Sequence, residues 1–203
     1  MPETVAPGPI GLPDPARRSD RAYRAILDAA KGLLEEHGFA AISVDQIAKR
    51  AGVGKQTIYR WWPNKAAVVL EAHGEQAAAH VPVPDTGSIR GDLRRIAEDF
   101  ANTLANTAAG RVCIELIGEA QHDAEFAEAY REIFVTARRA VVLAVLRRGR
   151  DRGEVRHDID LEYATDMLFG PIWYRGLTQH APLTRTFARA AADMLTDAIA
   201  LID

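Results

Sequence analysis

The fold is decided by residues 43–65, SVDQIAKRAGVGKQTIYRWWPNK. Ser43 and Gln46 have the spacing of a capping box, which predicts that a helix begins directly after Ser43. Gly52 ends that helix, because glycine adopts the positive φ of a tight turn at no steric cost. A second short helix follows, and Pro63 ends it. Two short helices joined by a glycine turn are typical of a helix-turn-helix.

The residues of this stretch divide into a packing side and an outward side. Ala48 and Ala51 are small enough to let the second helix cross the first closely, and Val53 and Ile58 are spaced to fill the gap between them. The outward side of the second helix carries groups that bond base edges and phosphates, namely Lys55, Gln56, Tyr59 and Arg60. The pattern therefore predicts a helix that reads DNA.

Helical periodicity continues on both sides of this motif. An apolar stripe runs from Tyr23 to Leu34 and ends at Gly38, and Asn64 begins a helix that reaches His73. Further helices are predicted over residues 89–106, 111–121, 124–152, 160–180 and 184–202. No run of residues has the pattern of a strand. We therefore expect an all-α protein of about nine helices, with an N-terminal helix-turn-helix head and a C-terminal helical body.

Composition marks the expected domain boundaries. Residues 1–16 contain five prolines and are expected to form a flexible tail. Residues 17–65 are predicted to be the helix-turn-helix domain, which continues into a linking helix over 66–80. A Pro- and Gly-rich loop begins at residue 81, so residues 81–203 are expected to form a separate regulatory and dimerisation domain.

Charge is distributed unevenly along the chain. The net charge is -3 at pH 7, yet residues 16–65 contain ten basic and five acidic side chains, which leaves the head at +5 and the remainder at -8. A basic head on an acidic body is the footprint of a small nucleic-acid-binding unit. The head opens with basic residues that form either an arm along DNA or a solvated helix start: Arg17, Arg18, Arg21 and Arg24.

Other sequence features argue against several protein classes. The single cysteine, Cys113, excludes an internal disulfide framework and fits a reducing cytoplasm. No apolar run reaches the roughly 18–20 residues that span a membrane, and no signal-peptide pattern is found, so we expect a cytoplasmic protein. Its six histidines lack metal-ligand spacing, and no nucleophile or phosphate-binding motif occurs. We therefore expect no catalysis, no metal and no cofactor.

Residues 43–65 resemble the DNA-binding signature of the Tet repressor family, and the flanking helices extend the likeness over residues 20–75. The resemblance implies that Ser43 caps its helix and touches phosphate. The residues implied to face bases are Val44, Lys55, Gln56 and Tyr59, and those implied to contact phosphates are Thr57, Arg60, Trp61 and Lys65. The sequence departs from the family pattern at Gly54, Gln56, Trp61 and Trp62. Core packing is favoured for Trp62 and stays equally open for Trp61.

The resemblance also implies a function for the body. In that family the larger domain dimerises through its last two helices and encloses a ligand pocket, and ligand binding releases the operator. A homodimer, an inverted-repeat operator in double-stranded DNA and a small-molecule effector are thus implied. The candidate pocket residues are Phe100, Leu104, Cys113, Leu116, Ile117, Phe134, Met167, Trp173 and Tyr174. The candidates for the dimer seam are Leu161, Leu168, Ile172, Phe187, Leu195 and Ile199.

Several alternatives stay open. Every pocket or seam candidate is equally consistent with ordinary core packing. Gly170-Pro171 lies within a predicted helix, is similar to a segment of many family members and should kink or break the helix. An architectural or activating DNA-binding protein without an effector has the same motif, and a cavity in the body would favour the ligand-responsive alternative. An enzyme with an accessory helix-turn-helix would turn over a bound small molecule.

Overall fold

The computed structural model describes residues 20–77 and 83–201, and it is helical almost throughout these ranges. The helices are α1 (Asp20–His37), α2 (Val44–Ala51), α3 (Lys55–Trp61), α4 (Lys65–Ala77), α5 (Ile89–Asn106), α6 (Ala108–Ala120), α7 (Ala124–Tyr130), a π-helical segment (Arg131–Thr136), α8 (Ala137–Asp151), α9 (Leu161–Thr178) and α10 (Arg185–Ile199). Because α7, the π segment and α8 are continuous, the described residues form nine helices, and the all-α prediction is confirmed. None of these helices is long and apolar enough to cross a membrane.

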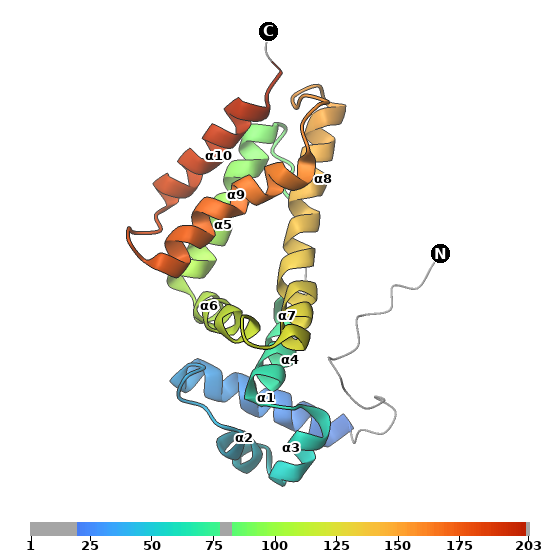
Figure 1. Cartoon of the computed structure of the whole chain (residues 1–203), viewed down its shortest axis with the longest axis vertical. Helices are drawn as coiled ribbons and strands as arrows, with labels where there is room; N and C mark the ends of the chain where they lie inside the picture. The colour runs from blue at the N-terminus through green and yellow to red at the C-terminus, as the bar shows by residue number, and fades with distance from the viewer. Residues whose placement is uncertain (1–19, 78–82, 202–203) are drawn as a thin grey trace, which may run out of the picture. The chain divides into compact units, whose positions relative to one another are not determined.

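The described chain forms two compact units. Their residues can be followed in Figure 1, where the colour runs from blue to red along the sequence. Of the described residues, the head unit comprises 20–77 together with 115–133, and the body unit comprises 83–114 and 134–201. Residues 115–133, which the sequence placed in the second domain, thus pack with the head. Gly74 in α4 illustrates this packing, since a Cβ there would lie 2.8 Å from Ile133 Cγ2.

The helix ends in the head follow local sequence signals. Ser43 Oγ accepts the backbone N–H of Gln46 at 3.3 Å, and Gly52 ends α2 with φ 67°. Asn64 Oδ1 accepts the N–H of Ala67 at 2.9 Å and so caps α4. In a full capping box the Gln46 side chain would accept the backbone N–H of Ser43. Here Gln46 Oε1 instead accepts from the Ser43 hydroxyl at 2.9 Å. Ser43 and Gly52 thus set the limits of α2, Asn64 sets the start of α4, and α1 packs against both of these helices.

In the body, α5 and α10 lie side by side (Figure 1), and a ladder of ion pairs joins them. Arg94 Nε contacts Asp193 at 2.6 Å, while Glu98 accepts from Arg185 Nε at 2.6 Å and Arg189 Nε at 2.7 Å. Burial alone raises the pKa of Glu98, but the hydrogen bonds from the two arginines outweigh it and hold the pKa below its usual value. Because the basic residues of α5 face acidic residues of α10 at one end of the ladder and the acidic Glu98 faces two arginines at the other, the ion pairs favour one register of the two antiparallel helices.

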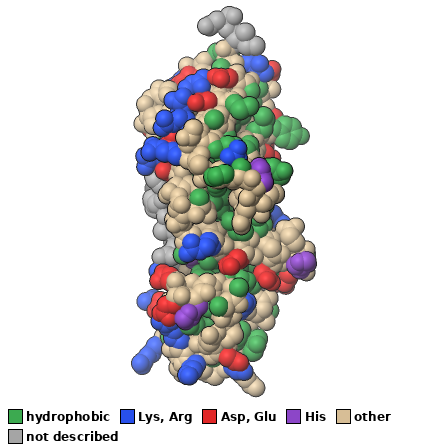
Figure 2. Space-filling model, turned by 90° about the vertical axis from the view of Figure 1, so that its left-hand side faces the viewer, with side chains coloured by type: hydrophobic (Ala, Val, Ile, Leu, Met, Phe, Trp, Pro, Cys, Tyr) green, Lys and Arg blue, Asp and Glu red, His purple; other side chains and the backbone are tan. Residues whose placement is uncertain are grey.

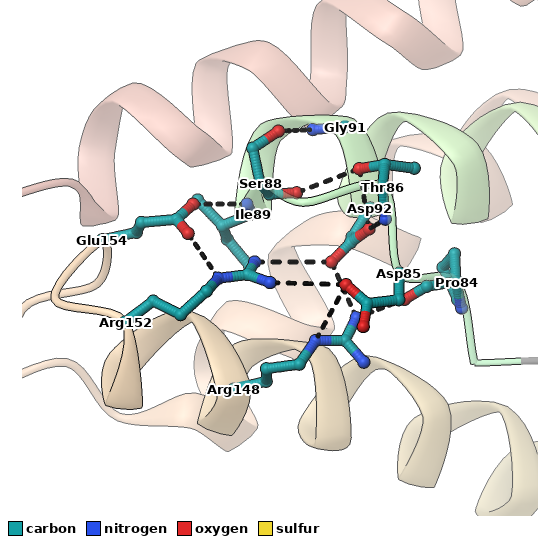
Figure 3. Close-up of polar contacts among 10 residues, drawn as sticks. All are labelled: Pro84, Asp85, Thr86, Ser88, Ile89, Gly91, Asp92, Arg148, Arg152 and Glu154. Carbon is teal, nitrogen blue, oxygen red and sulfur yellow. Dashed lines mark hydrogen bonds and ion pairs between the residues drawn. The ribbon is translucent and has the colours of Figure 1, made fainter.

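A second polar cluster centres on Asp92, which is fully buried (Figure 3). Its carboxylate accepts from Thr86 N at 2.6 Å, from Thr86 Oγ1 at 2.8 Å and from Arg148 Nη2 at 2.7 Å. Arg152 approaches the same carboxylate at 3.5 Å and pairs with Glu154. Glu154 in turn accepts the N–H of Ile89. The cluster therefore ties the segment before α5 to the C-terminal end of α8.

Three details of the helices differ from the sequence prediction. The helix expected at Arg111 begins at Ala108, because Thr107 Oγ1 accepts the N–H of Gly110 at 3.0 Å and caps it. The π segment interrupts the long helix without any warning in the sequence. The helix α9 runs unbroken through Pro171, so the predicted break is wrong. Pro171 has no N–H to donate to the carbonyl of the preceding turn. Because Gly170 and Pro171 are both exposed, water can hydrate this unpaired carbonyl and the helix can continue.

Candidate functional site

The outward face of α3 is the candidate DNA-reading surface of the head. Lys55, Gln56 and Arg60 are exposed, and Tyr59 is 55% exposed although it is an aromatic residue. On the opposite face Ile58 is completely buried. One face of this seven-residue helix thus packs on the head, while the other presents hydrogen-bonding groups to solvent.

The ends of α2 and α3 lie close together and add polar groups to this surface. Ser43 is exposed, while Val44 and Thr57 are half-buried. Lys55 Nζ forms an ion pair with Asp45, an acid in the first turn of α2. Both members of the pair are more than half exposed, so solvent screens the pair and the lysine can exchange partners at low cost.

The Lys65 side chain is directed toward the head's own backbone. Its ammonium donates to the carbonyl oxygens of Phe39 at 3.0 Å and Ile42 at 3.2 Å, and it lies 4.4 Å from the centroid of the Phe39 ring. Two of the three N–H donors of the ammonium are therefore used to hold the turn between α1 and α2.

Both tryptophans at the end of α3 belong to the core of the head. Trp62 is 1% exposed, stacks on Tyr23 with ring centroids 5.7 Å apart and donates from Nε1 to Glu71 at 2.7 Å. The packing favoured for Trp62 is thus confirmed. Trp61 is 6% exposed and packs edge-to-face on Trp62, so its side chain lies away from the outward residues of α3.

The predicted basic arm is only partly covered by the structure. Arg17 and Arg18 lie outside the described residues, whereas Arg21 and Arg24 are exposed in the first turns of α1. Arg50 on α2 pairs with Glu36 through two bonds, of 2.8 and 2.5 Å. The charge of Arg50 is therefore balanced by a carboxylate of the head itself.

The body contains two neighbouring cavities of about 310 and 300 Å³. Both are lined by Phe100 from α5, Arg138 from α8 and Phe169 from α9. The first extends toward Arg95, Ile96, Asp99, Thr103, Val141 and Pro84, and the second toward Phe134, Val135, Arg139, Asp166, Gly170 and Trp173. These volumes reach the lower end of the range for small-molecule sites, about 300–1,000 Å³.

The structure separates the predicted pocket residues into groups. Phe100, Phe134 and Trp173 line a cavity. Leu104, Cys113 and Leu116 are buried outside both cavities, and Ile117 is half-buried. Met167 and Tyr174 line neither cavity, and they are 58% and 62% exposed. These two residues are on the outer surface of α9 because the inner face of that helix is taken by Leu168, Phe169 and Ile172.

The sequence analysis missed Arg138 and Phe169, which both cavities share. Arg138 follows Phe134 by four residues and precedes Val141 by three, so it lies on an apolar helix face. A cation placed within an apolar stripe was the available signal.

Exposed apolar side chains gather on the surface formed by α9 and α10. They are Tyr163, Met167, Tyr174, Leu177 and Met194. Figure 2 shows hydrophobic side chains on this part of the surface of the body unit. Four of the seam candidates, namely Leu168, Ile172, Leu195 and Ile199, are buried within the chain itself, which is the intrachain packing that the sequence left open as their alternative. Leu161 and Phe187 are half-buried.

Two family models match the chain. The model of bacterial regulatory proteins of the tetR family matches residues 26–72, which include α2, α3 and most of α1. The tetracyclin repressor-like C-terminal domain matches residues 83–195, which is more than half of the chain.

Individual proteins extend this similarity over most of the chain. An uncharacterised HTH-type transcriptional regulator, YdeS of Bacillus subtilis, is 42% identical over 172 residues, which is 85% of this chain and 86% of that protein. The DNA-binding transcriptional repressor TetR of Mycobacteroides abscessus is 31% identical over 87% of this chain and 92% of its own length. The crystal structure of the TetR family transcription regulator SCO0332 superimposes with a TM-score of 0.73 and 34% identity, covering 89% of this chain and all of that one.

Proposed function

The chain belongs to the tetR family of helix-turn-helix transcriptional regulators, and we propose that it is a homodimeric repressor that leaves its operator when a small molecule binds in the body. The observation that carries the DNA-binding part is the outward face of α3. A helix that buries Ile58 while it exposes Lys55, Gln56 and Tyr59 is arranged to enter the major groove.

The proposed contacts to DNA combine the roles that the family resemblance implies with the exposure of each residue. Lys55, Gln56 and Tyr59 face the base edges, and Val44 contacts them from the start of α2. Ser43, Thr57 and Arg60 contact phosphates and so fix the orientation of the head. Trp61 and Lys65 act indirectly in this proposal, because one is buried and the other holds the turn before α2.

We place the dimer contact on the exposed apolar surface of α9 and α10. Tyr163, Met167 and Tyr174 repeat at helical spacing along α9, and Met194 is exposed on α10, so these two helices leave large apolar side chains in water, as protein interfaces do. A two-fold axis through this surface pairs two heads, so the operator is an inverted repeat with half-sites about one DNA turn apart.

The two cavities support the effector part of the proposal. An effector-independent DNA-binding protein has no need of cavities of about 310 and 300 Å³ within its body. The similar proteins described above are transcriptional regulators, so the body is proposed to sense a ligand rather than to catalyse a reaction. Residues 17–65 and their linking helix are proposed as the DNA-binding domain, and residues 81–203 as the sensing and dimerising domain, of which residues 115–133 pack with the head.

Selection of bound fragments from genomic DNA tests this function most directly. The full-length protein is expected to enrich an inverted repeat, and gel shifts with that sequence then allow compounds to be screened for release. Enrichment of single half-sites, or of no sequence at all, would contradict the proposal. If the protein binds the operator but no compound releases it, the protein is a regulator that does not respond to an effector.

A further inference from the structure

The polar groups around the two cavities are unequally neutralised. Arg95 Nε pairs with Asp99 Oδ2 at 2.8 Å, one helical turn away on α5. Arg139 pairs with Glu162 at 2.6 Å and also with Asp166. The charges on these lining residues are therefore balanced within the body unit.

Arg138 is the exception among the lining cations. Within the part of the chain that the structure describes, no carboxylate lies within 4 Å of its guanidinium, and its one hydrogen bond is donated by Nη1 to the carbonyl oxygen of Phe134 at 2.7 Å. Burial raises the pKa of the nearby Cys113 thiol to about 11, so this thiol is neutral at physiological pH and does not balance the charge. A guanidinium has five N–H donors, and most of those on Arg138 are available to a ligand.

The walls around this cation are aromatic. The Phe100 ring lies edge-to-face with Phe169 at 5.0 Å and with Trp173 at 5.5 Å. The Arg138 guanidinium is 5.9 Å from the centroid of Phe100 and 5.6 Å from that of Phe134. The rings keep the guanidinium partly out of water, which strengthens its attraction for an anion.

On the premise of the proposed function, we propose that the effector is an aromatic carboxylate whose anionic group pairs with Arg138 and whose ring packs among Phe100, Phe169 and Trp173. A carboxylate matches the planar fork of a guanidinium with two parallel hydrogen bonds. An aromatic ring gains edge-to-face contacts from the lining rings. A cationic ligand would be repelled by the Arg138 guanidinium, and a neutral ligand would leave the charge of Arg138 without a partner.

Three probes that share the naphthalene ring and differ in charge test this assignment on the full-length protein: 2-naphthoate, its neutral amide 2-naphthamide, and the cation 2-naphthylmethylammonium. Isothermal titration calorimetry is expected to show that naphthoate binds at least tenfold more tightly than the amide, and that the cation does not bind. Equal affinity for naphthoate and naphthamide overturns the assignment, and so does failure of naphthoate and the larger biphenyl-4-carboxylate to bind.

Substitution locates the contact. Arg138→Gln is expected to weaken naphthoate binding on the order of tenfold to a hundredfold and to change naphthamide binding less than about twofold. Arg147→Gln removes the same charge from an exposed position of α8 and serves as the matched control. If Arg138→Gln melts early, Arg138→Lys keeps the charge without the fork and is expected to retain part of the preference for the anion. Unchanged naphthoate affinity in both variants refutes the contact.

The same experiment separates this inference from the function on which it rests. If naphthoate binds through Arg138 but leaves the operator complex intact in gel shifts, the ligand class stands and ligand-induced release fails. If neutral or cationic compounds release the operator while no carboxylate binds, release stands and the ligand class fails.

Discussion

Lys65 donates from Nζ to the backbone carbonyl of Phe39 at 3.0 Å, so the first residue of α4 holds the turn that follows α1. We expect Lys65→Ala to destabilise the head by about 1–3 kcal/mol, since the carbonyls of Phe39 and Ile42 lose a charged partner. Thermal melting of the variant tests this. Lys49→Ala, at an exposed site of α2, is the control and should melt as the unsubstituted protein does. Normal melting of Lys65→Ala with a smaller salt dependence of DNA binding would instead assign Lys65 to a phosphate.

Tyr59→Ala tests the docking of α3. Because the ring is 55% exposed, its loss should alter stability by less than about 0.5 kcal/mol. Specific operator binding should nevertheless be lost, while the dimer persists in size-exclusion chromatography. Wild-type affinity of this variant in a gel shift would refute the proposed orientation of the helix.

Gln56 and Arg60 form a matched pair, since both are exposed on α3 but are assigned to different parts of DNA. Gln56→Ala should relax the preference at one base pair, by about 1–3 kcal/mol of discrimination. Arg60→Ala should weaken binding to all sequences alike and reduce the slope of log affinity against log salt by about one. Titrations of the operator and its single-base variants at several salt concentrations distinguish the two. The same pattern in both variants would contradict the assignment.

The helix-turn-helix could be predicted closely because its limits depend on local chemistry. Ser43 and Gly52 set the two ends of α2, Pro63 follows the end of α3, and Asn64 caps α4, and each of them acts within three or four residues of its own position. Thr107 offered the same kind of local signal for α6, although that helix was expected to begin at Arg111.

Tertiary contacts could not be predicted in this way. The carbonyls that receive Lys65 are 23 and 26 residues away in sequence, so a surface role was the natural expectation for a lysine. In α9, periodicity gave the apolar positions but did not distinguish Leu168, which packs inside the chain, from Met167, which faces outward. Both residues are apolar, and the neighbouring helices α5, α8 and α10 decide which of them is covered.

Met194→Glu tests the dimer surface. Met194 is 74% exposed, so the change should leave the fold of a monomer intact. In a dimer it would bury a carboxylate against an apolar partner surface, and we expect dissociation to monomers. Analytical ultracentrifugation measures this. Val83→Glu makes a similar change at an exposed site before α5 and should stay dimeric. A dimeric Met194→Glu would place the interface elsewhere.

Asp92 makes the body sensitive to acid. Burial alone raises the pKa of its carboxyl, but the hydrogen bonds from Thr86 and Arg148 outweigh burial and hold the pKa below the ordinary value of 3.8. A lowered pKa in the folded state means that this contribution to stability is complete above pH 3.8 and is lost as the pH falls through the folded value.

Asp92→Ala should therefore cost about 3–5 kcal/mol at neutral pH, because Arg148 loses its buried partner, and this difference from the unsubstituted protein should shrink below the ordinary pKa of Asp92. Urea denaturation at a series of pH values, followed by circular dichroism, measures both effects. Asp158→Ala removes a carboxylate that is 74% exposed and paired with Arg156, and it should cost no more than about 1 kcal/mol. A cost for Asp92→Ala as small as this control would show that the cluster in Figure 3 adds little stability, since Arg148 would then have found water in place of the carboxylate.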